Sequence, residues 1–294
     1  TLIEKEQKMK EEFLFTKIEI PNEGDANNPW RFPELTPRNV ALAEAMIDND
    51  SAYRRSRDKN AEQKGKYSGS TAYWMHQLKD YYEGKTERTF EAIIEGAVKA
   101  VDSENSTHLS SDGVGLKQIT KRIIARYSEN KEKLKSDLAT RKSVKDLFCK
   151  ISEITDVKEA NRKNPEKKYN PRVNISFASK FCHYACFYLF EGKPEQDNFP
   201  IFDSVLSKAI QVYSWYFLGK SVNMEFEREK VDTVWKVYEA YCQTIDDIRN
   251  NHKEKISRNG FDHILWYYFK GRDKEETSKL IKAAKADWER RNHK

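Results

Sequence analysis

Two charged residues, Lys180 and Asp203, stand at the starts of two apolar segments. Lys180 precedes FCHYACFYLF, and the polar run NISFAS before it predicts a turn. Lys180 is therefore expected in the first turn of an apolar helix. There the positive end of the helix dipole and burial against aromatic neighbours both favour the neutral amine. A neutral amine is a nucleophile, so the sequence predicts a reactive lysine.

Asp203 follows the turn EGKPEQDNFP, and we expect it or Ser204 to cap the helix that begins there. A carboxylate is favoured at a helix N-terminus, so Asp203 should stay ionised. One helix and one turn separate Asp203 from Lys180, so both side chains can return to the mouth between two antiparallel helices. The alternative is a solvated lysine and an ordinary cap, because aspartate caps are common.

The arrangement resembles the helix-hairpin-helix DNA glycosylases, and within them the 8-oxoguanine DNA glycosylase type. The matching features are Lys180 after NISFAS, the apolar helix, the turn containing proline, and Asp203 before SVLSKAIQVY. The resemblance implies a mainly α, two-lobed fold with a cleft between the lobes, its hairpin and catalytic segment over about 142–218. It also implies that the hairpin residues Ser176, Ala178 and Ser179 contact DNA.

The activity implied by the resemblance is excision of a modified or damaged base from double-stranded DNA. The enzyme would flip the nucleotide out of the duplex, and Asp203 would stabilise the positive charge that develops on the sugar. Lys180 would attack C1′, form a Schiff base and permit β-elimination. Without an active Lys180, Asp203 would direct a water and leave an abasic site. Trp74, Phe202 and Trp266 are candidates for the base pocket, with core packing as the alternative.

Basic residues supply candidates for phosphate contacts. The best group immediately precedes the expected hairpin and comprises Arg162, Lys163, Lys167, Lys168 and Arg172. A second group comprises the loop 54–66 together with Lys121, Arg122 and Arg126. Runs of charge are more often solvated surface, so this alternative remains open.

The composition sets broad limits on the kind of protein. Lys and Arg number 53 against 47 Asp and Glu, a balance that permits DNA binding without requiring it. No apolar run approaches the length that a bilayer needs, and no signal peptide is visible, so we expect a monomeric cytoplasmic protein. No compact four-cysteine run exists for an iron–sulfur cluster, and no cofactor or metal is predicted. Cys182, His183 and Cys186 are interpreted as core.

The pattern of elements is almost entirely helical. Residues 1–35 are expected to form an N-terminal arm with an edge strand in FLFTKIEI, and residues 36–294 a helical domain. Thr36 and Pro37 are expected to begin one helix, Thr86 to cap another, and Asp273 to cap the last. A long helix is expected from about Met224 to Asn250.

Two other functions remain in play. Because the two hairpin glycines of the glycosylases are replaced by Ser176 and Ala178, the chain is alternatively a non-catalytic helical DNA-binding or complex-forming protein. A helical interaction protein unrelated to DNA is a further alternative. Within the glycosylase interpretation, the modified base could belong to damaged cellular DNA or to phage DNA excised in defence.

Overall fold

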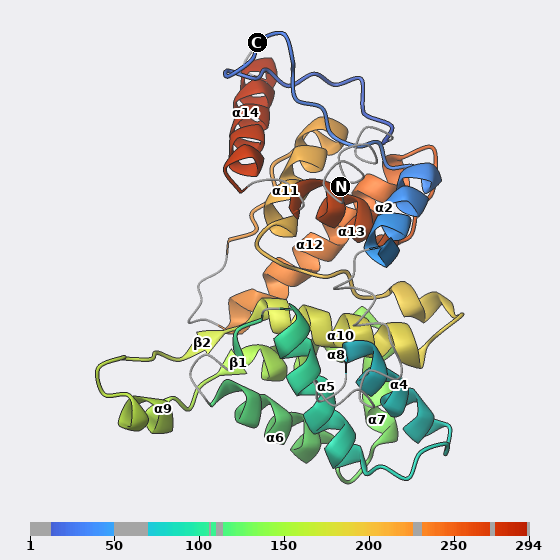
Figure 1. Ribbon diagram of the computed structural model, residues 1–294, viewed down its shortest axis with the longest axis vertical. Coiled ribbons are helices and arrows are strands. Elements are labelled where there is room, and N and C mark those ends of the chain that lie inside the picture. Colours follow the sequence, from blue (N-terminus) through green and yellow to red (C-terminus); the bar gives the residue numbers. More distant parts are fainter. Residues whose placement is uncertain are drawn as a thin grey trace. The chain divides into compact units, whose positions relative to one another are not determined.

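The computed structural model describes residues 13–49, 70–105, 107–109, 114–225, 231–270 and 274–292. This part of the chain is mainly helical, as predicted, and contains one two-stranded sheet (Figure 1). The chain divides into two compact units. Unit 1 comprises Thr1–Asp50, Asp203–Met224 and Glu239–Lys294, and unit 2 comprises Ser51–Phe202 and Glu225–Tyr238.

The elements that lie within unit 2 are α4 (Thr71–Tyr82), α5 (Phe90–Asn105), α6 (Gly115–Tyr127), α7 (Glu132–Leu138), α8 (Arg141–Ser152), β1 (Glu153–Ile154), α9 (Lys158–Lys163), β2 (Arg172–Val173), α10 (Ile175–Leu189) and the 3-10 helix η3 (Pro194–Asp197). Those that lie within unit 1 are α2 (Pro37–Asn49), α11 (Leu206–Tyr213), the π-helix η4 (Ser214–Leu218), α13 (Arg258–Leu265), the π-helix η5 (Trp266–Lys270) and α14 (Lys274–Asn292). The helix α12 (Val231–Asn251) contributes residues to both units.

Helix α10 is the centre of unit 2. It packs against α4, α5, α7, α8 and η3, which surround it in Figure 1. Its sequence explains this place, because its polar residues are few and Phe177, Phe181, Cys182 and Cys186 are fully buried. Strands β1 and β2 pair antiparallel beside this bundle, with Glu153 opposite Val173.

Helix α11 is the centre of unit 1. It packs against α13, α14, η4 and η5. Aromatic rings fill the space around it: Tyr213 contacts Phe32 and Phe261 edge to face, with ring centroids 4.9 and 5.6 Å apart. The hydroxyl of Tyr213 donates to the carbonyl of Pro33 at 2.8 Å. The N-terminal segment is thereby part of the core of unit 1.

The expected strand in FLFTKIEI is present only as two isolated bridges, Phe15 with Pro33 and Ile20 with Trp30. The segment does fold back on residues 30–34, and Thr16 donates its N–H to Phe32 at 2.9 Å. The two bridges lie five residues apart on one segment and three residues apart on the other, so one regular ladder cannot contain both.

The helix starts test the predicted caps. Thr36 and Pro37 are confirmed, since α2 begins at Pro37 and the Thr36 hydroxyl accepts from the Asn39 N–H at 3.2 Å. The Thr86 cap is wrong. Helix α5 begins at Phe90, and Thr89 accepts the N–H groups of Ala92 and Ile93. Thr86 instead donates its hydroxyl to Gln77 in α4.

Two other expectations fall on residues outside the described ranges. These are the cap at Asp273 and the basic loop 54–66. The long helix α12 is present, with Val231 as its first residue and Asn251 as its last. Within the described ranges, no helix combines the length and the apolar composition that crossing a bilayer requires.

Candidate functional site

Lys180 lies in the second turn of α10, and the prediction that it occupies the first turn is wrong. The run NISFAS is not a turn: Asn174 caps the helix by accepting the N–H of Phe177 at 2.9 Å, and residues 175–179 are already helical. Asparagine is among the strongest helix caps, which explains the earlier start. The helix dipole acts mainly within the first turn, so it no longer accounts for a reactive amine.

The amine of Lys180 is nevertheless in an unusual place. The residue is 6% exposed, and its Nζ donates to the backbone carbonyl of Asn105 at 3.0 Å. Lysine is rarely buried to this degree. Burial within a bundle of apolar helices therefore marks Lys180 as more than a solvated surface residue.

The residue before Lys180 is bonded to the residue before Asp203. The hydroxyl of Ser179 accepts the N–H of Phe202 at 3.0 Å and donates to its carbonyl at 3.2 Å. Ser179 and Phe202 are both in unit 2 and both buried. These two hydrogen bonds to one hydroxyl hold Phe202, the last residue of the segment Ser51–Phe202, against α10.

Asp203 is the first residue of the next segment of unit 1, and its predicted capping role is confirmed. Its Oδ1 accepts the N–H groups of Val205 and Leu206, each at 2.8 Å, at the start of α11. Its backbone carbonyl accepts the N–H of Ser207. Asp203 is 7% exposed, whereas Ser204, the alternative cap, is exposed.

Within unit 1, Asp203 has acidic and phenolic neighbours that the sequence did not indicate as a group. Burial raises the pKa of Tyr241 well above its ordinary value, and the carboxylates of Asp262 and Asp203 raise it further. Asp262 itself is 3% exposed. Lys180 belongs to unit 2 and Asp203 to unit 1.

The predicted hairpin residues do not form a hairpin, because all three lie in the first turn and a half of α10. Ala178 and Ser179 are fully buried, which leaves no surface of theirs for a phosphate. Ser176 is half-buried. The expected phosphate contacts at Ala178 and Ser179 are therefore wrong for this structure. The physical reason is that α10 is central to unit 2, so even its start is covered.

The three candidate base-pocket residues lie mainly in the packed interior of their units. The ring of Trp74 is buried between α4 and α5, and Phe202 is 4% exposed. Trp266 begins η5 in unit 1 and is half-buried. A shallow depression of about 320 Å³ in unit 1 is lined by other residues: Phe217, Leu218, Lys220, Asp247, Asn250 and Asn251. The base pocket stays a prediction.

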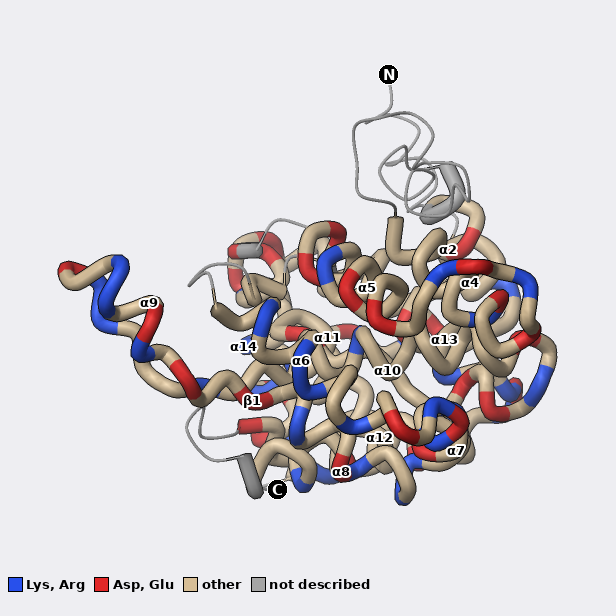
Figure 2. The backbone as a smooth tube through the Cα atoms, turned by 90° about the horizontal axis from the view of Figure 1, so that it is seen from below, with Lys and Arg blue, Asp and Glu red and all other residues tan. Residues whose placement is uncertain are grey.

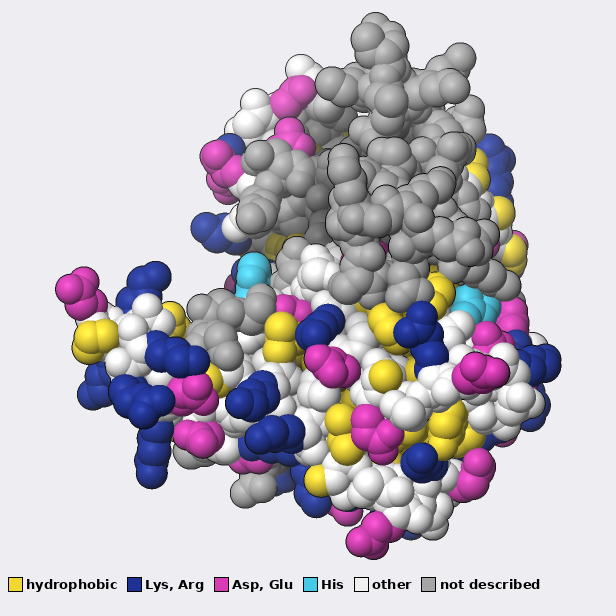
Figure 3. Space-filling view, turned by 60° about the horizontal axis from the view of Figure 1, so that its bottom comes forward, with side chains coloured by type: hydrophobic (Ala, Val, Ile, Leu, Met, Phe, Trp, Pro, Cys, Tyr) yellow, Lys and Arg dark blue, Asp and Glu magenta, His cyan; other side chains and the backbone are white. Residues whose placement is uncertain are grey.

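The best group of predicted phosphate contacts lies on a projection. Residues 155–171, here called the basic projection, extend from the sheet of unit 2 and carry α9 at their far end (Figure 2). They hold five basic side chains against three acidic ones. Dark-blue side chains gather on this part of the surface in Figure 3. The exposed members are Lys158, Arg162, Lys163, Lys167 and Lys168, with Arg172 half-buried at its base.

The basic projection is held in place by hydrogen bonds between side chains and the backbone. The side chain of Asn161 bonds both backbone groups of Tyr169, accepting from its N–H at 2.6 Å and donating to its carbonyl at 3.0 Å. At the base, Gln118 of α6 accepts the N–H groups of Thr155 and Asp156. These hydrogen bonds hold α9 in place, and the charged groups of most of its basic side chains remain in solvent.

The second group of predicted phosphate contacts is mostly committed to internal bonds. Lys121 is exposed. Arg122 donates to the carbonyls of Lys150 and Glu153 and thereby joins α6 to the end of α8. Arg126 is nearly buried and does not reach outward, so its expected phosphate contact is wrong for this structure.

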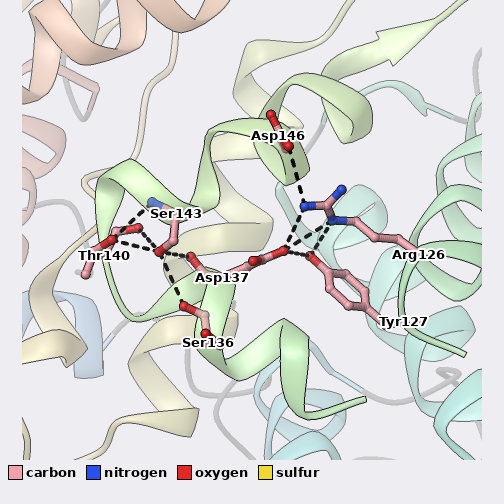
Figure 4. Close-up of polar contacts among 7 residues, drawn as sticks. All are labelled: Arg126, Tyr127, Ser136, Asp137, Thr140, Ser143 and Asp146. Carbon is pink, nitrogen blue, oxygen red and sulfur yellow. Dashed lines mark hydrogen bonds and ion pairs between the residues drawn. The ribbon is translucent and has the colours of Figure 1, made fainter. Parts of the chain in front are cut away.

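Arg126 belongs to a buried network that joins α6, α7 and α8 (Figure 4). Its guanidinium donates to the Asp137 carboxylate at 2.9 Å, and the Tyr127 hydroxyl donates to the same oxygen at 2.8 Å. Asp146 lies 3.9 Å away as a second, exposed counter-charge. Burial raises the pKa of Tyr127 strongly, and its bond to Asp137 adds to the effect. The network is a structural connection between three helices.

Cys182, His183 and Cys186 are core residues, as interpreted. All three are buried, and burial raises the pKa of the Cys186 thiol to about 12. The Nδ1 of His183 lies 2.7 Å from the carbonyl of Phe199. Within the described residues, no group of three His, Cys, Asp or Glu side chains is arranged to hold a metal ion.

No protein-family model, curated protein or solved structure matches the chain.

Sequence reasoning missed Asn105. Lys180 donates to the Asn105 carbonyl, and the Tyr184 hydroxyl, one turn further along α10, donates to the Asn105 Oδ1 at 2.9 Å. The contact between Lys180 and Asn105 spans 75 residues of sequence. No local pattern carries such a signal.

Proposed function

We propose that the protein is a DNA glycosylase that excises a flipped modified or damaged base, with Lys180 and Asp203 as its catalytic residues. The proposal includes the two-lobed arrangement with a cleft that the resemblance implies, and a monomeric cytoplasmic protein. The observation that carries it is the pair of hydrogen bonds between Ser179 and Phe202. Lys180 and Asp203 directly follow these two residues in the chain, and each is buried.

Burial supports the role of Lys180. An amine that is 6% exposed and held on a carbonyl oxygen is kept from bulk water until a substrate arrives. In the proposed step the nitrogen attacks C1′ of the sugar as the bond to the base breaks. The resulting Schiff base allows β-elimination of the DNA strand.

Two fixed N–H groups support the role of Asp203. Because Val205 and Leu206 hold its Oδ1, the carboxylate keeps one orientation, and a pre-oriented negative charge stabilises a cationic sugar best. If Lys180 does not attack, the same carboxylate would direct a water molecule and leave an abasic site. The proposal therefore covers both a bifunctional and a monofunctional enzyme.

The test is borohydride trapping of the protein on duplexes that carry an abasic site, 8-oxoguanine or a hypermodified cytosine. The variants are Lys180→Gln and Asp203→Asn, with Lys208→Gln as the control because Lys208 is exposed on α11. We expect a covalent adduct that Lys180→Gln abolishes and Lys208→Gln retains. Abasic sites that depend on Asp203 without an adduct would support the monofunctional form. No adduct and no base release on any of these duplexes would overturn the proposal.

A second candidate is a non-catalytic DNA-binding protein, and the basic projection favours it. Its exposed cations lie on a braced element, and Asp203 already has a structural task as a cap. Binding through these cations is salt-dependent, with a slope of about 0.9 in log K per neutralised phosphate. Replacing Lys167 and Lys168 by Gln should reduce the slope by about two, and replacing the exposed Lys253 and Lys255 should not. Binding with this behaviour but without base release would favour the second candidate.

The biological role under the first candidate has two forms, repair of damaged DNA and excision of modified bases from phage DNA. The trapping substrates separate them by chemistry, since 8-oxoguanine represents damage and the hypermodified cytosine represents phage DNA. The duplex that yields an adduct identifies the role.

A further inference from the structure

The last residue of α5, Asn105, bonds to α10 on the face that carries Lys180. Lys180 Nζ donates to the Asn105 carbonyl at 3.0 Å, and the Tyr184 hydroxyl donates to the Asn105 side-chain oxygen at 2.9 Å. Lys180 and Tyr184 are four residues apart in the helix, so their side chains lie on one face. Asn105 is thus the shared acceptor for both.

His108, near the end of α5, is held in a strained conformation. His108 has φ of 59°, which is uncommon for a residue other than glycine and persists only where surrounding bonds fix it. The Asp102 carboxylate accepts from the Thr107 hydroxyl at 2.6 Å and the Leu109 N–H at 2.7 Å. Asn174, the cap of α10, donates to the Thr107 carbonyl at 2.6 Å. The position of Asn105 is therefore determined from both sides.

The bond to a backbone carbonyl has a specific consequence for an attacking amine. A carbonyl oxygen only accepts, so it takes an N–H of Lys180 and never its lone pair.

We propose that Asn105 and Tyr184 are positioning residues that aim the amine of Lys180. This inference rests on the proposed function, because it assumes that Lys180 attacks a sugar carbon. The bond from Nζ to C1′ forms as the C1′–base bond breaks, and that electron pair leaves with the base. One proton of the amine ends on the released base, so the step balances with no further reactant.

The variant that isolates the effect is Tyr184→Phe, which removes the hydroxyl and keeps the ring against His183. Tyr188→Phe is the matched control. Tyr188 is one turn further along α10, is also half-buried, and places its ring 4.6 Å from His76. Asn105→Asp retains an oxygen for the Tyr184 hydroxyl, and Asn105→Ala does not.

The first measurement does not depend on DNA chemistry. Competitive acetylation of the folded protein, read by mass spectrometry from pH 7 to 11, gives the reactivity of each lysine. Loss of one hydrogen bond corresponds to a change of about threefold to tenfold. We expect Tyr184→Phe and Asn105→Ala to change Lys180 labelling by that factor, with Lys208 labelling unchanged. Tyr188→Phe should leave both lysines as in the parent protein, and Asn105→Asp should lower Lys180 labelling at neutral pH, because a carboxylate favours the protonated amine.

The second measurement is the rate of borohydride trapping on abasic-site DNA at saturating protein. We expect Tyr184→Phe to lower the trapping rate by a similar factor without weakening DNA binding. Unchanged Lys180 labelling in folded Tyr184→Phe would overturn the positioning role, whatever the trapping result. Changed labelling with neither trapping nor base release by the parent protein would uphold the positioning of Lys180 and overturn the glycosylase proposal.

Discussion

Asp203 combines two tasks at the scale of a single residue. Its carboxylate holds the start of α11 through the N–H groups of Val205 and Leu206, and the proposed chemistry uses the negative charge of the same group. An asparagine retains the acceptor oxygen and loses the charge. The structural and the chemical task can therefore be separated by two substitutions at one position.

We expect Asp203→Ala to lower the free energy of unfolding by about 1 kcal/mol, the usual cost of a lost helix cap, and Asp203→Asn to lower it much less. Urea denaturation of both variants measures this difference. Equal losses for the two variants would mean that the charge, rather than the cap, stabilises α11.

The predictions that succeeded at this scale were local ones. Asp203, Thr36 and Pro37 act on backbone groups only a few residues away, so residue type and position suffice to predict them. The bond from Lys180 to Asn105 joins residues that only folding brings together. The burial of Lys180 was consequently predicted, whereas the group that receives its amine was not.

At the scale of elements, the contact between α4 and α5 depends on a missing side chain. The ring of Trp74 lies where a Cβ on Gly96 would be, only 2.2 Å from that position. Gly96 is buried in the middle of α5. The close approach of these two helices therefore requires glycine at position 96.

Gly96→Ala should destabilise the protein. Alanine in a helix is favoured over glycine by about 1 kcal/mol, but overpacking against a buried ring costs about 1–3 kcal/mol, and the overlap here involves three ring atoms. Thermal unfolding should show a lower midpoint. Gly24→Ala is the control, because its Cβ would meet only an ordinary contact at 3.5 Å. A stabilised Gly96→Ala variant would contradict the packing of α4 on α5.

The elements themselves were easier to predict than their limits. Composition predicts the apolar helix, but Ser176 and Ser179 interrupt the apolar pattern at its start. Phe177 and Phe181 are both fully buried, and their spacing of four residues already belongs to the helix. Strands β1 and β2 were not predicted, since two residues each are too short to show alternation.

At the scale of the whole molecule, buried phenols make stability depend on pH. Burial raises the pKa of Tyr127, Tyr213 and Tyr241 well above the ordinary value of 10. In the unfolded chain these groups lose their protons near pH 10, whereas in the folded protein they keep them. The unfolded state is therefore favoured progressively as the pH rises above 10.

We expect the free energy of unfolding to be insensitive to these phenols below about pH 9 and to fall above pH 10. Urea denaturation at several pH values measures this dependence. Absorbance at 295 nm should show that part of the 15 tyrosines ionise only when the protein unfolds. Reversible ionisation of all of them near pH 10 in the folded protein would contradict their burial.

The helical class was predictable at this scale, because the sequence lacks the alternation of strands and helices that parallel sheets need. The division into units was not. The sequence predicts an arm over residues 1–35, yet Phe32 packs on Tyr213 in the core of unit 1. Such a contact depends on the whole fold, and no nearby residue indicates it.

Unit 1 is assembled from three segments of chain, and most of unit 2 lies between the first two, in Ser51–Phe202. During translation the first segment of unit 1 therefore emerges long before its partners. At about 5–20 residues per second, the roughly 150 intervening residues take roughly 8–30 seconds to synthesise. Throughout that interval Phe32 lacks the ring of Tyr213 on which it packs. The order of synthesis makes unit 1 the later unit to fold, and its first segment the stretch of nascent chain with the greatest need of a chaperone.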